Sequence, residues 1–186
     1  QRQMCIRDRI RAYIRRAKAP HDVGWKVVIK DRRNALKNPL AHLHSEPTLE
    51  PCAQAPVLWD PINYLETCPS SDGACAMVLS SESAAKRAPQ KPAFVQGTSL
   101  RSEPIFFPGR DQVSPQAGRD CAADVFAQAQ IRNPLDELDM AELYVPFSWF
   151  EPMWLENLGF AAPGEGWRLV EDGVTDFGGA LPTNVS

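Results

Sequence analysis

The clearest pattern along the chain is a short apolar run followed by the start signal of a helix. Residues 140–145 are largely apolar, which predicts a buried strand, and Pro146 ends it because proline cannot donate to a sheet ladder. Ser148 and Glu151 follow with the spacing of a capping box, which predicts a helix. Tyr144 is therefore expected at the carboxyl end of a strand, just before a helix N-terminus, where ligands collect in α/β proteins.

Three further stretches have helical periodicity. Residues 10–19 place apolar side chains on one face, and Pro20 ends the pattern. Asp22 is a suitable N-cap for a second helix over residues 23–36. A third helix is expected to run from a cap at Asp120 to Gln130, where alanine, valine and phenylalanine recur every three or four positions.

Short apolar runs between these helices predict strands. Residues 62–68 and 74–80 are expected as two strands joined by a turn that contains Asp-Gly. The second run is apolar throughout, which is typical of a strand buried on both faces. Residues 88–92 form a connector, and residues 93–98 are another candidate strand. The alternation of strand and helix indicates an α/β fold with parallel pairing.

Composition narrows the class of protein. The 186 residues suffice for one good domain or two small ones, and 44% hydrophobic content is normal for a globular protein. A net charge of −3 gives no global reason to expect a nucleic-acid partner, and no run approaches the roughly 20 apolar residues of a membrane span. The basic residues concentrated before residue 40 could bind phosphates, but a solvated helical face is the favoured interpretation.

The five cysteines are odd in number and scattered, without a C-x-x-C pair. This favours free thiols in a reducing compartment, and a cytoplasmic location is expected. His42, His44 and Cys52 do not reach the three or four ligands at defined spacing that a metal site requires. No metal is therefore expected.

Both ends of the chain indicate a fragment. Residues 1–9 lack an initiator methionine and resemble translated sequencing-adaptor read-through, so they are expected to be a non-native leader. Residues 180–186 stop abruptly after a Gly-Gly turn. We expect a chain cut at both ends.

Four blocks, in order, resemble the thiolase superfamily. They are NALKNPLAH at 34–42, CPSSDGACAMVL at 68–79, AELYVPFS at 141–148 and FGGALPTNVS at 177–186. The likeness is to the sterol-carrier-protein thiolase and lipid-transfer-protein-like branch. It implies an incomplete, layered αβαβα thiolase-like fold of class α/β.

The resemblance also implies a division of the chain. Residues 10–61 would be a segment of the helical loop domain, residues 62–88 the end of the N-terminal half, and residues 89–186 the start of the C-terminal half. No cofactor would be bound covalently, and a coenzyme A thioester would be the substrate.

The activity implied is that of an acyltransferase that makes or breaks a carbon–carbon bond beside a coenzyme A thioester, in lipid or sterol metabolism. This reaction needs a cysteine nucleophile, a histidine, a second cysteine as base and an oxyanion hole. No cysteine here lies in the nucleophile's context, so the full-length protein would be the enzyme and this fragment alone would be inactive.

Six positions match family sites. The resemblance implies a catalytic role for Tyr144 and Asn184, and contacts to the substrate or its coenzyme A for Cys68, Ser70, Ser71 and Phe147. Tyr144 replaces the asparagine or histidine of the family block, and Val185 departs from its proline. Without the resemblance, Tyr144 would be read as a packed strand tyrosine.

Two alternatives to the acyltransferase remain. A tyrosine could donate a hydrogen bond to a carbonyl or act as base in a retro-aldol cleavage, as in steroid side-chain aldolases of this branch. The chain could also belong to a non-catalytic lipid-transfer subunit that binds acyl-coenzyme A or sterol. The resemblance also implies a homodimer and a small OB-fold, zinc-containing partner protein.

Overall fold

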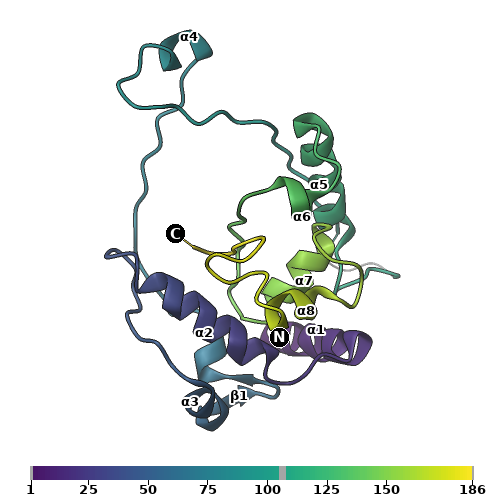
Figure 1. The fold of residues 1–186 in the computed structure, drawn as a ribbon. Helices are drawn as coiled ribbons and strands as arrows, with labels where there is room; N and C mark the ends of the chain where they lie inside the picture. Colours follow the sequence, from purple (N-terminus) through teal and green to yellow (C-terminus); the bar gives the residue numbers. More distant parts are fainter. Residues whose placement is uncertain (1, 105–107, 186) are drawn as a thin grey trace.

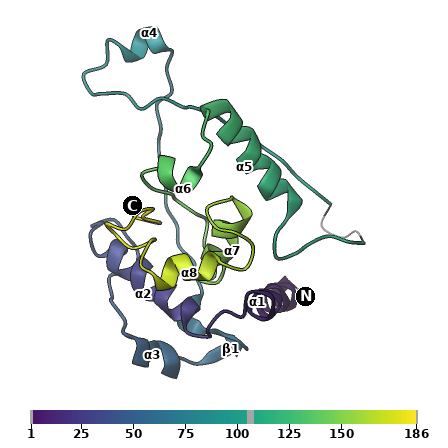
Figure 2. The same ribbon diagram turned by 45° about the vertical axis from the view of Figure 1, so that its right-hand side comes forward.

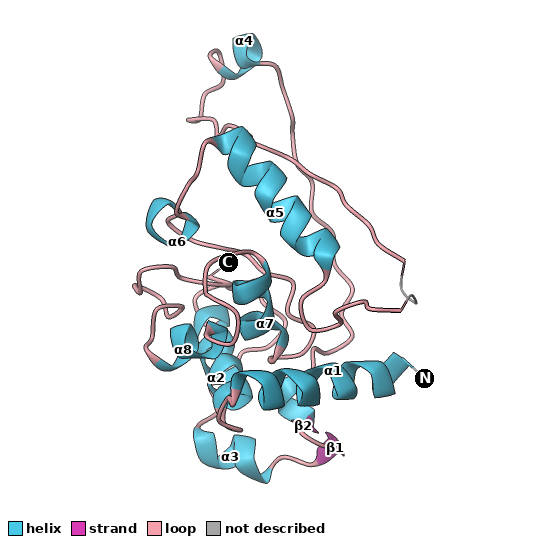
Figure 3. Cartoon of the chain, turned by 90° about the vertical axis from the view of Figure 1, so that its right-hand side faces the viewer, coloured by secondary structure: helices cyan, strands magenta, loops and turns pink. Residues whose placement is uncertain are grey.

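The computed structural model describes residues 2–104 and 108–185, which are mainly helices and long connections (Figure 1). The helices are α1 (Arg2–Ala17), α2 (Val23–Ala35), α3 (Leu49–Gln54), α4 (Glu82–Ala85), α5 (Gln116–Ala129), α6 (Pro134–Glu137), α7 (Phe150–Asn157) and α8 (Gly166–Glu171). Strands β1 (Val57–Trp59) and β2 (Ile62–Asn63) pair antiparallel, and a 3-10 helix, η1 (Tyr64–Glu66), follows them. Figure 3 shows these two short strands beside α3.

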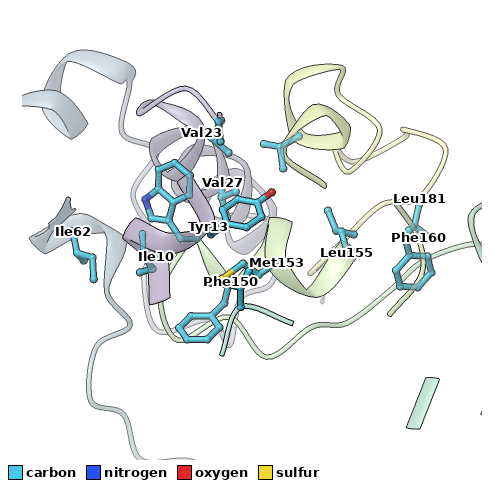
Figure 4. Close-up of a cluster of buried hydrophobic side chains, with 14 residues drawn as sticks. Ile10, Tyr13, Val23, Val27, Ile62, Phe150, Met153, Leu155, Phe160 and Leu181 are labelled. Atoms are coloured by element: carbon cyan, nitrogen blue, oxygen red, sulfur yellow. The ribbon is translucent and has the colours of Figure 1, made fainter. Parts of the chain in front are cut away.

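The core lies where α1 and α2 meet α7 and α8. Ile10 and Tyr13 of α1 are fully buried, as the apolar face of residues 10–19 predicts. The rings of Tyr13 and Trp149 pack edge to face, with centroids 6.3 Å apart. Met153 and Leu155 of α7 complete this cluster (Figure 4). The packing joins the beginning of the chain to its last third.

The predicted helices are confirmed with shifted ends. α2 begins after Asp22, whose carboxylate pairs with Lys26 at 2.9 Å instead of capping the helix. The helix expected after a cap at Asp120 begins at Gln116 instead, so Asp120 lies within the helix and does not cap it. α1 begins at Arg2, so part of the expected leader is helical.

The capping box expected at the start of α7 does not form. Trp149 is the residue before the helix, and no side chain caps it. The hydroxyl of Ser148 donates instead to Oε1 of Glu66, at 3.2 Å, and Glu151 accepts from Lys30. Both side chains are thus used in contacts with distant segments, which outweigh the local pairing that the spacing predicts.

The strands expected at residues 74–80 and 93–98 are absent. Met77 and Val78 are 79% and 93% exposed, and both stretches are irregular. A strand requires a neighbour to complete its hydrogen bonds, and no described segment pairs with either stretch. Figures 1 and 2 both show α4 at the tip of this long excursion, away from the other helices.

The strands expected at 62–68 and 140–145 form only in part. β2 ends at Asn63 because its side chain caps η1, accepting from the backbone of Leu65 at 3.0 Å. Residues 140–145 make a single parallel bridge, between Ala141 and Thr183. The domain boundaries at 61/62 and 88/89 stay predictions.

Two negative findings concern the described ranges only. No helix within residues 2–104 and 108–185 has the length and apolar content needed to cross a membrane. Across the same residues, no three histidine, cysteine, aspartate or glutamate side chains are arranged to hold a metal ion.

Candidate functional site

Cys68 and Phe147, two of the predicted site residues, lie on distant segments that pair with each other. Thr67 and Phe147 form an antiparallel bridge. The backbone N–H of Cys68 donates to the carbonyl of Pro146 at 3.0 Å, and that of Ser148 to the carbonyl of Glu66 at 3.1 Å. The segment of Cys68 therefore lies against that of Phe147, although about 80 residues separate them.

A hollow of about 100 Å³ opens beside this pairing. Its polar lining includes Asp31 and Arg32 of α2, the successive residues 66–68, and Ser148. Val145 contributes part of the apolar lining. The exposed thiol of Cys68 lies at this hollow, where contact with a pantetheine thioester is predicted.

Glu66 is fixed at the wall of the hollow. Its Oε2 accepts from the backbone of Asn63 at 2.9 Å, and its Oε1 accepts from the hydroxyl of Ser148 at 3.2 Å. Burial raises the pKa of Glu66, and the hydrogen bonds that it accepts only partly oppose this. The carboxyl is thus a structural element that joins the two paired segments.

A buried charge cluster lies behind the hollow. The ammonium of Lys30 is 2.7 Å from Oε2 of Glu151 and 3.0 Å from Oδ1 of Asp31. Burial alone would lower the pKa of Lys30, but the charges of Glu151 and Asp31 outweigh it and raise the pKa overall. Lys30 also donates to the carbonyl of Thr183 at 3.3 Å, which ties α2 to the C-terminal segment.

Asn184 is held in place by hydrogen bonds with Leu143, Ala141 and Asn34. Its side-chain Oδ1 accepts from the backbone of Leu143 at 2.7 Å, and its backbone N–H donates to the carbonyl of Ala141 at 3.0 Å. Its carbonyl accepts from Nδ2 of Asn34 at 3.1 Å. With φ at +51°, Asn184 adopts the left-handed conformation that asparagine tolerates. Its side chain therefore supports the segment that leads to Tyr144.

Tyr144 is 81% exposed. Its carbonyl accepts from Nε1 of Trp154 at 3.0 Å, whereas its hydroxyl forms no hydrogen bond within the described residues. The next residue, Val145, lines the hollow, but the ring of Tyr144 does not. The packed-strand interpretation of Tyr144 does not hold, and the phenol is free to meet a ligand.

The predicted serines lie outside the hollow. Ser70 and Ser71 are exposed, and the hydroxyl of Ser71 is within hydrogen-bond distance of Nδ1 of His42. Phe147 is half-buried, with its ring centroid 6.0 Å from that of Phe150. The roles of these residues stay predictions.

Several residues of the site were not predicted from the sequence. They are polar side chains of α2 and one of η1: Lys30, Asp31, Arg32, Asn34 and Glu66. A signal existed for α2, because Val23, Val27, Lys30 and Asn34 follow one another at helical spacing. A polar residue that continues an apolar face is a candidate for a buried contact.

Comparison with known protein families identifies one match. Residues 106–186 match the model of the thiolase C-terminal domain-like family. The chain spans about two fifths of the length of the curated relatives that it first matches, with 42%, 42% and 40% of them covered.

Three curated relatives of this chain are named for three different activities. An acetyl-CoA acetyltransferase of Methanothermobacter thermautotrophicus is 31% identical over 161 residues, which are 86% of this chain and 42% of that protein. A steroid side-chain-cleaving aldolase of Thermomonospora curvata is 31% identical over 181 residues, covering 94% of this chain and 46% of that protein. The sterol carrier protein 2 of Bos taurus is 28% identical over 169 residues, which cover 88% of this chain and 30% of that protein.

A solved structure is similar over the whole chain. The Ltp2-ChsH2(DUF35) aldolase superposes with a TM-score of 0.88 at 26% identity, and the match covers 100% of this chain and 50% of that one. The fold is therefore the expected partial thiolase-like fold, although two of the strands inferred from the sequence are not formed here.

Proposed function

Because the chain is thiolase-like, with its likeness in the sterol-carrier-protein thiolase branch and over part of the family's length, we propose that it acts on acyl-coenzyme A thioesters. The reaction would form or cleave a carbon–carbon bond beside the thioester, as an acyltransferase of lipid or sterol metabolism. The observation that carries this proposal is the hollow at Cys68, formed where the segments at 66–68 and 146–148 pair.

The residues around the hollow would bind and orient the thioester. Cys68 would contact the pantetheine arm and Phe147 would shield the acyl group, while Ser70 and Ser71 would reach the ligand from the exposed loop beside Cys68. In the acyltransferase, a thiolate attacks the carbonyl two carbons from the thioester carbonyl, and the carbon–carbon bond breaks with its electrons passing to the thioester as an enolate, which is protonated to acetyl-coenzyme A. The cleaved acyl group stays on the attacking sulfur as a new thioester and is then transferred to the thiol of coenzyme A, which releases the thiolate. Cys52 is unsuited to be that thiolate, since burial raises the pKa of its thiol.

A retro-aldol cleavage is the second candidate, and the exposure of Tyr144 favours it. As base, the phenolate would take the proton of a β-hydroxyl group. The oxygen's electrons then form a carbonyl as the carbon–carbon bond breaks, and the bond's electrons pass to the thioester as an enolate that is protonated to acyl-coenzyme A. Because the hydroxyl of Tyr144 has no partner among the described residues, it is available for this role.

Asn184 would act in either reaction by holding the chain before Tyr144. Its contact with Leu143 fixes the backbone two residues ahead of Val145, which lines the hollow. The catalytic role that the resemblance implies for Asn184 itself is part of this proposal.

Product analysis separates the two reactions. The protein that carries this chain would be given acetoacetyl-coenzyme A with coenzyme A, and separately a β-hydroxyacyl-coenzyme A. Formation of acetyl-coenzyme A alone from the first supports the acyltransferase, whereas a free aldehyde or ketone from the second supports the lyase. Turnover of neither, with acyl-coenzyme A still bound, leaves the non-catalytic lipid-transfer subunit.

Tyr144→Phe tests the role of the phenol, with Tyr64→Phe as the matched control. Both tyrosines are exposed, at 81% and 63%, but Tyr64 lies on η1 and does not line the hollow. Loss of a general base costs about 10²–10⁴-fold in rate. Equal turnover of the two variants on the β-hydroxyacyl substrate would remove Tyr144 from the mechanism.

Partners remain part of the proposal. We propose a homodimer and a small OB-fold, zinc-containing partner protein, and the similar solved structure joins two named components. Cys52, Cys68, Cys75 and Cys121 are free thiols, which suits the cytoplasmic location that we propose. Mass measurement in solution, alone and with a candidate partner, tests the assembly.

A further inference from the structure

Arg32 is a half-buried cation at the hollow, and few of its hydrogen-bond donors are used. Its guanidinium carries five N–H donors, and the hydrogen bond that the structure gives it is from Nη1 to the hydroxyl of Ser45, at 3.3 Å. No carboxylate lies within ion-pair distance of Arg32 among residues 2–104 and 108–185. Burial lowers the pKa of Arg32, as expected when a cation loses water without full compensation.

The carboxylates nearest to Arg32 are engaged with other groups. Asp31 pairs with Lys30 at 3.0 Å, and Glu66 accepts from Asn63 and Ser148. The charge of Asp31 still favours the charged form of Arg32, but its oxygens do not meet the guanidinium. Neither carboxylate therefore forms an ion pair with Arg32.

Arginines beside another hollow are satisfied. Arg16 pairs with Asp111 at 2.9 Å, and Arg110 pairs with Glu103 at 2.5 Å. An arginine at a hollow is thus not in itself a sign of a ligand in this protein. Arg32 differs because it combines partial burial, unused donors and a neighbouring thiol, Cys68.

We propose that Arg32 is the anion-recognition residue of the hollow and binds the charged oxygens of a phosphate or carboxylate group on the ligand. The inference rests on the proposed function, since Cys68 would contact the pantetheine arm of the same ligand. That arm has phosphates at one end and the acyl group at the other, so the anion is either a phosphate of coenzyme A or a carboxylate of the acyl group. The planar fork of arginine matches both groups.

Calorimetric titration of the wild-type protein, Arg32→Gln and Arg132→Gln tests the proposal. Arg132 is exposed and lines none of the hollows described, so it is the matched control. The probes are coenzyme A, pantetheine and pyrophosphate. If the anion is a phosphate, Arg32→Gln weakens coenzyme A binding about tenfold or more and leaves pantetheine within twofold, because a charge-assisted bond is lost.

A second pair of probes, succinyl- and butyryl-coenzyme A, tests whether the anion is a carboxylate of the acyl group. If Arg32 binds an acyl carboxylate, the wild-type protein prefers the succinyl thioester, Arg32→Gln abolishes that preference, and coenzyme A binding is unchanged. Arg32→Lys keeps the charge without the fork, so it gives an intermediate loss. It also allows the test should the glutamine variant unfold.

The outcomes separate this inference from the proposed function. Pyrophosphate binding that depends on Arg32, without any binding of coenzyme A by the wild-type protein, retains the anion site and overturns the proposed function. Binding of every probe within twofold of wild type by Arg32→Gln overturns the anion site alone. A wild-type protein that binds no probe overturns both.

Discussion

The ammonium nitrogen of Lys30 lies 2.7 Å from Oε2 of Glu151, and the two side chains are only 4% and 0% exposed. The pair joins α2 to the first turn of α7. Oε1 of Glu151 has no hydrogen-bond partner among the described residues. The contact is therefore an ion pair whose burial is incompletely compensated, and its removal should be measurable.

Lys30→Met should destabilise the protein strongly. It leaves the buried carboxylate of Glu151 without its cation, which costs about 3–5 kcal/mol at pH 8. Denaturant unfolding of this variant and of Lys30→Met/Glu151→Gln measures the effect. The double variant should be the more stable of the two, and a double variant less stable than Lys30→Met would contradict a role for the unpaired charge.

The same pair predicts a pH dependence of stability. Burial raises the pKa of Glu151 from its ordinary 4.5 to about 7, so the folded state holds the proton more tightly than the unfolded state. The stability linked to this proton is complete below about pH 4.5 and is lost as the pH rises through about 7, with a slope of at most about 1.4 kcal/mol per pH unit.

Melting curves at pH 5, 6, 7 and 8 measure this loss. Glu151→Gln removes the titrating group, so the difference in stability between wild type and this variant should shift against the wild type as the pH rises. A difference that is constant from pH 5 to 8 would show that Glu151 does not titrate in this range.

Gly24→Ala should destabilise the contact between α2 and the paired segments. An added Cβ would overlap the carboxylate of Glu66 and would lie 2.5 Å from Nε1 of Trp149. Overpacking of this kind costs about 1–3 kcal/mol. Gly73→Ala is the control, because nothing lies within 4 Å of its Cβ position. Equal unfolding midpoints for the two variants would rule out the close approach at Gly24.

Two substitutions separate the contributions that the backbone conformation and the side chain of Asn184 make to the free energy of unfolding. Asn184→Ala loses the acceptor for Leu143 and also places alanine at φ +51°, so we expect a loss of about 2 kcal/mol. Asn184→Gly loses the same acceptor without the backbone strain, and its loss should be smaller. Chemical denaturation of the pair measures both values, and the reverse order would count against the conformation described here.

The helices of this fold follow from the sequence because their apolar periodicity is local. Helices form at both predicted stretches, as α1 (Arg2–Ala17) and α5 (Gln116–Ala129), and Pro20 lies shortly beyond the first of them. Residues 74–80 show the limit of that reasoning. An apolar run predicts a buried strand only if other segments pair with it, and pairing is a property of the whole fold.

The candidate site also contains residues that the sequence predicts and residues that it does not. Cys68 and Phe147 were predicted from family blocks, and their segments do lie together. Arg32 and Glu66 were not predicted, because the role of a polar side chain depends on which segment of the folded chain it faces. Ser148 and Glu151 match a local capping pattern, yet they bond Glu66 and Lys30, which lie more than 80 residues away.

Protection of Cys68 from alkylation tests the central claim most directly. Cys68 and Cys75 are both exposed free thiols, but Cys68 lines the hollow and Cys75 does not. Iodoacetamide labelling of each would be followed by peptide mass spectrometry, with and without saturating coenzyme A. The account predicts that coenzyme A slows the labelling of Cys68 several-fold and leaves that of Cys75 unchanged. Equal labelling rates for Cys68 with and without coenzyme A would contradict a thioester site at this hollow.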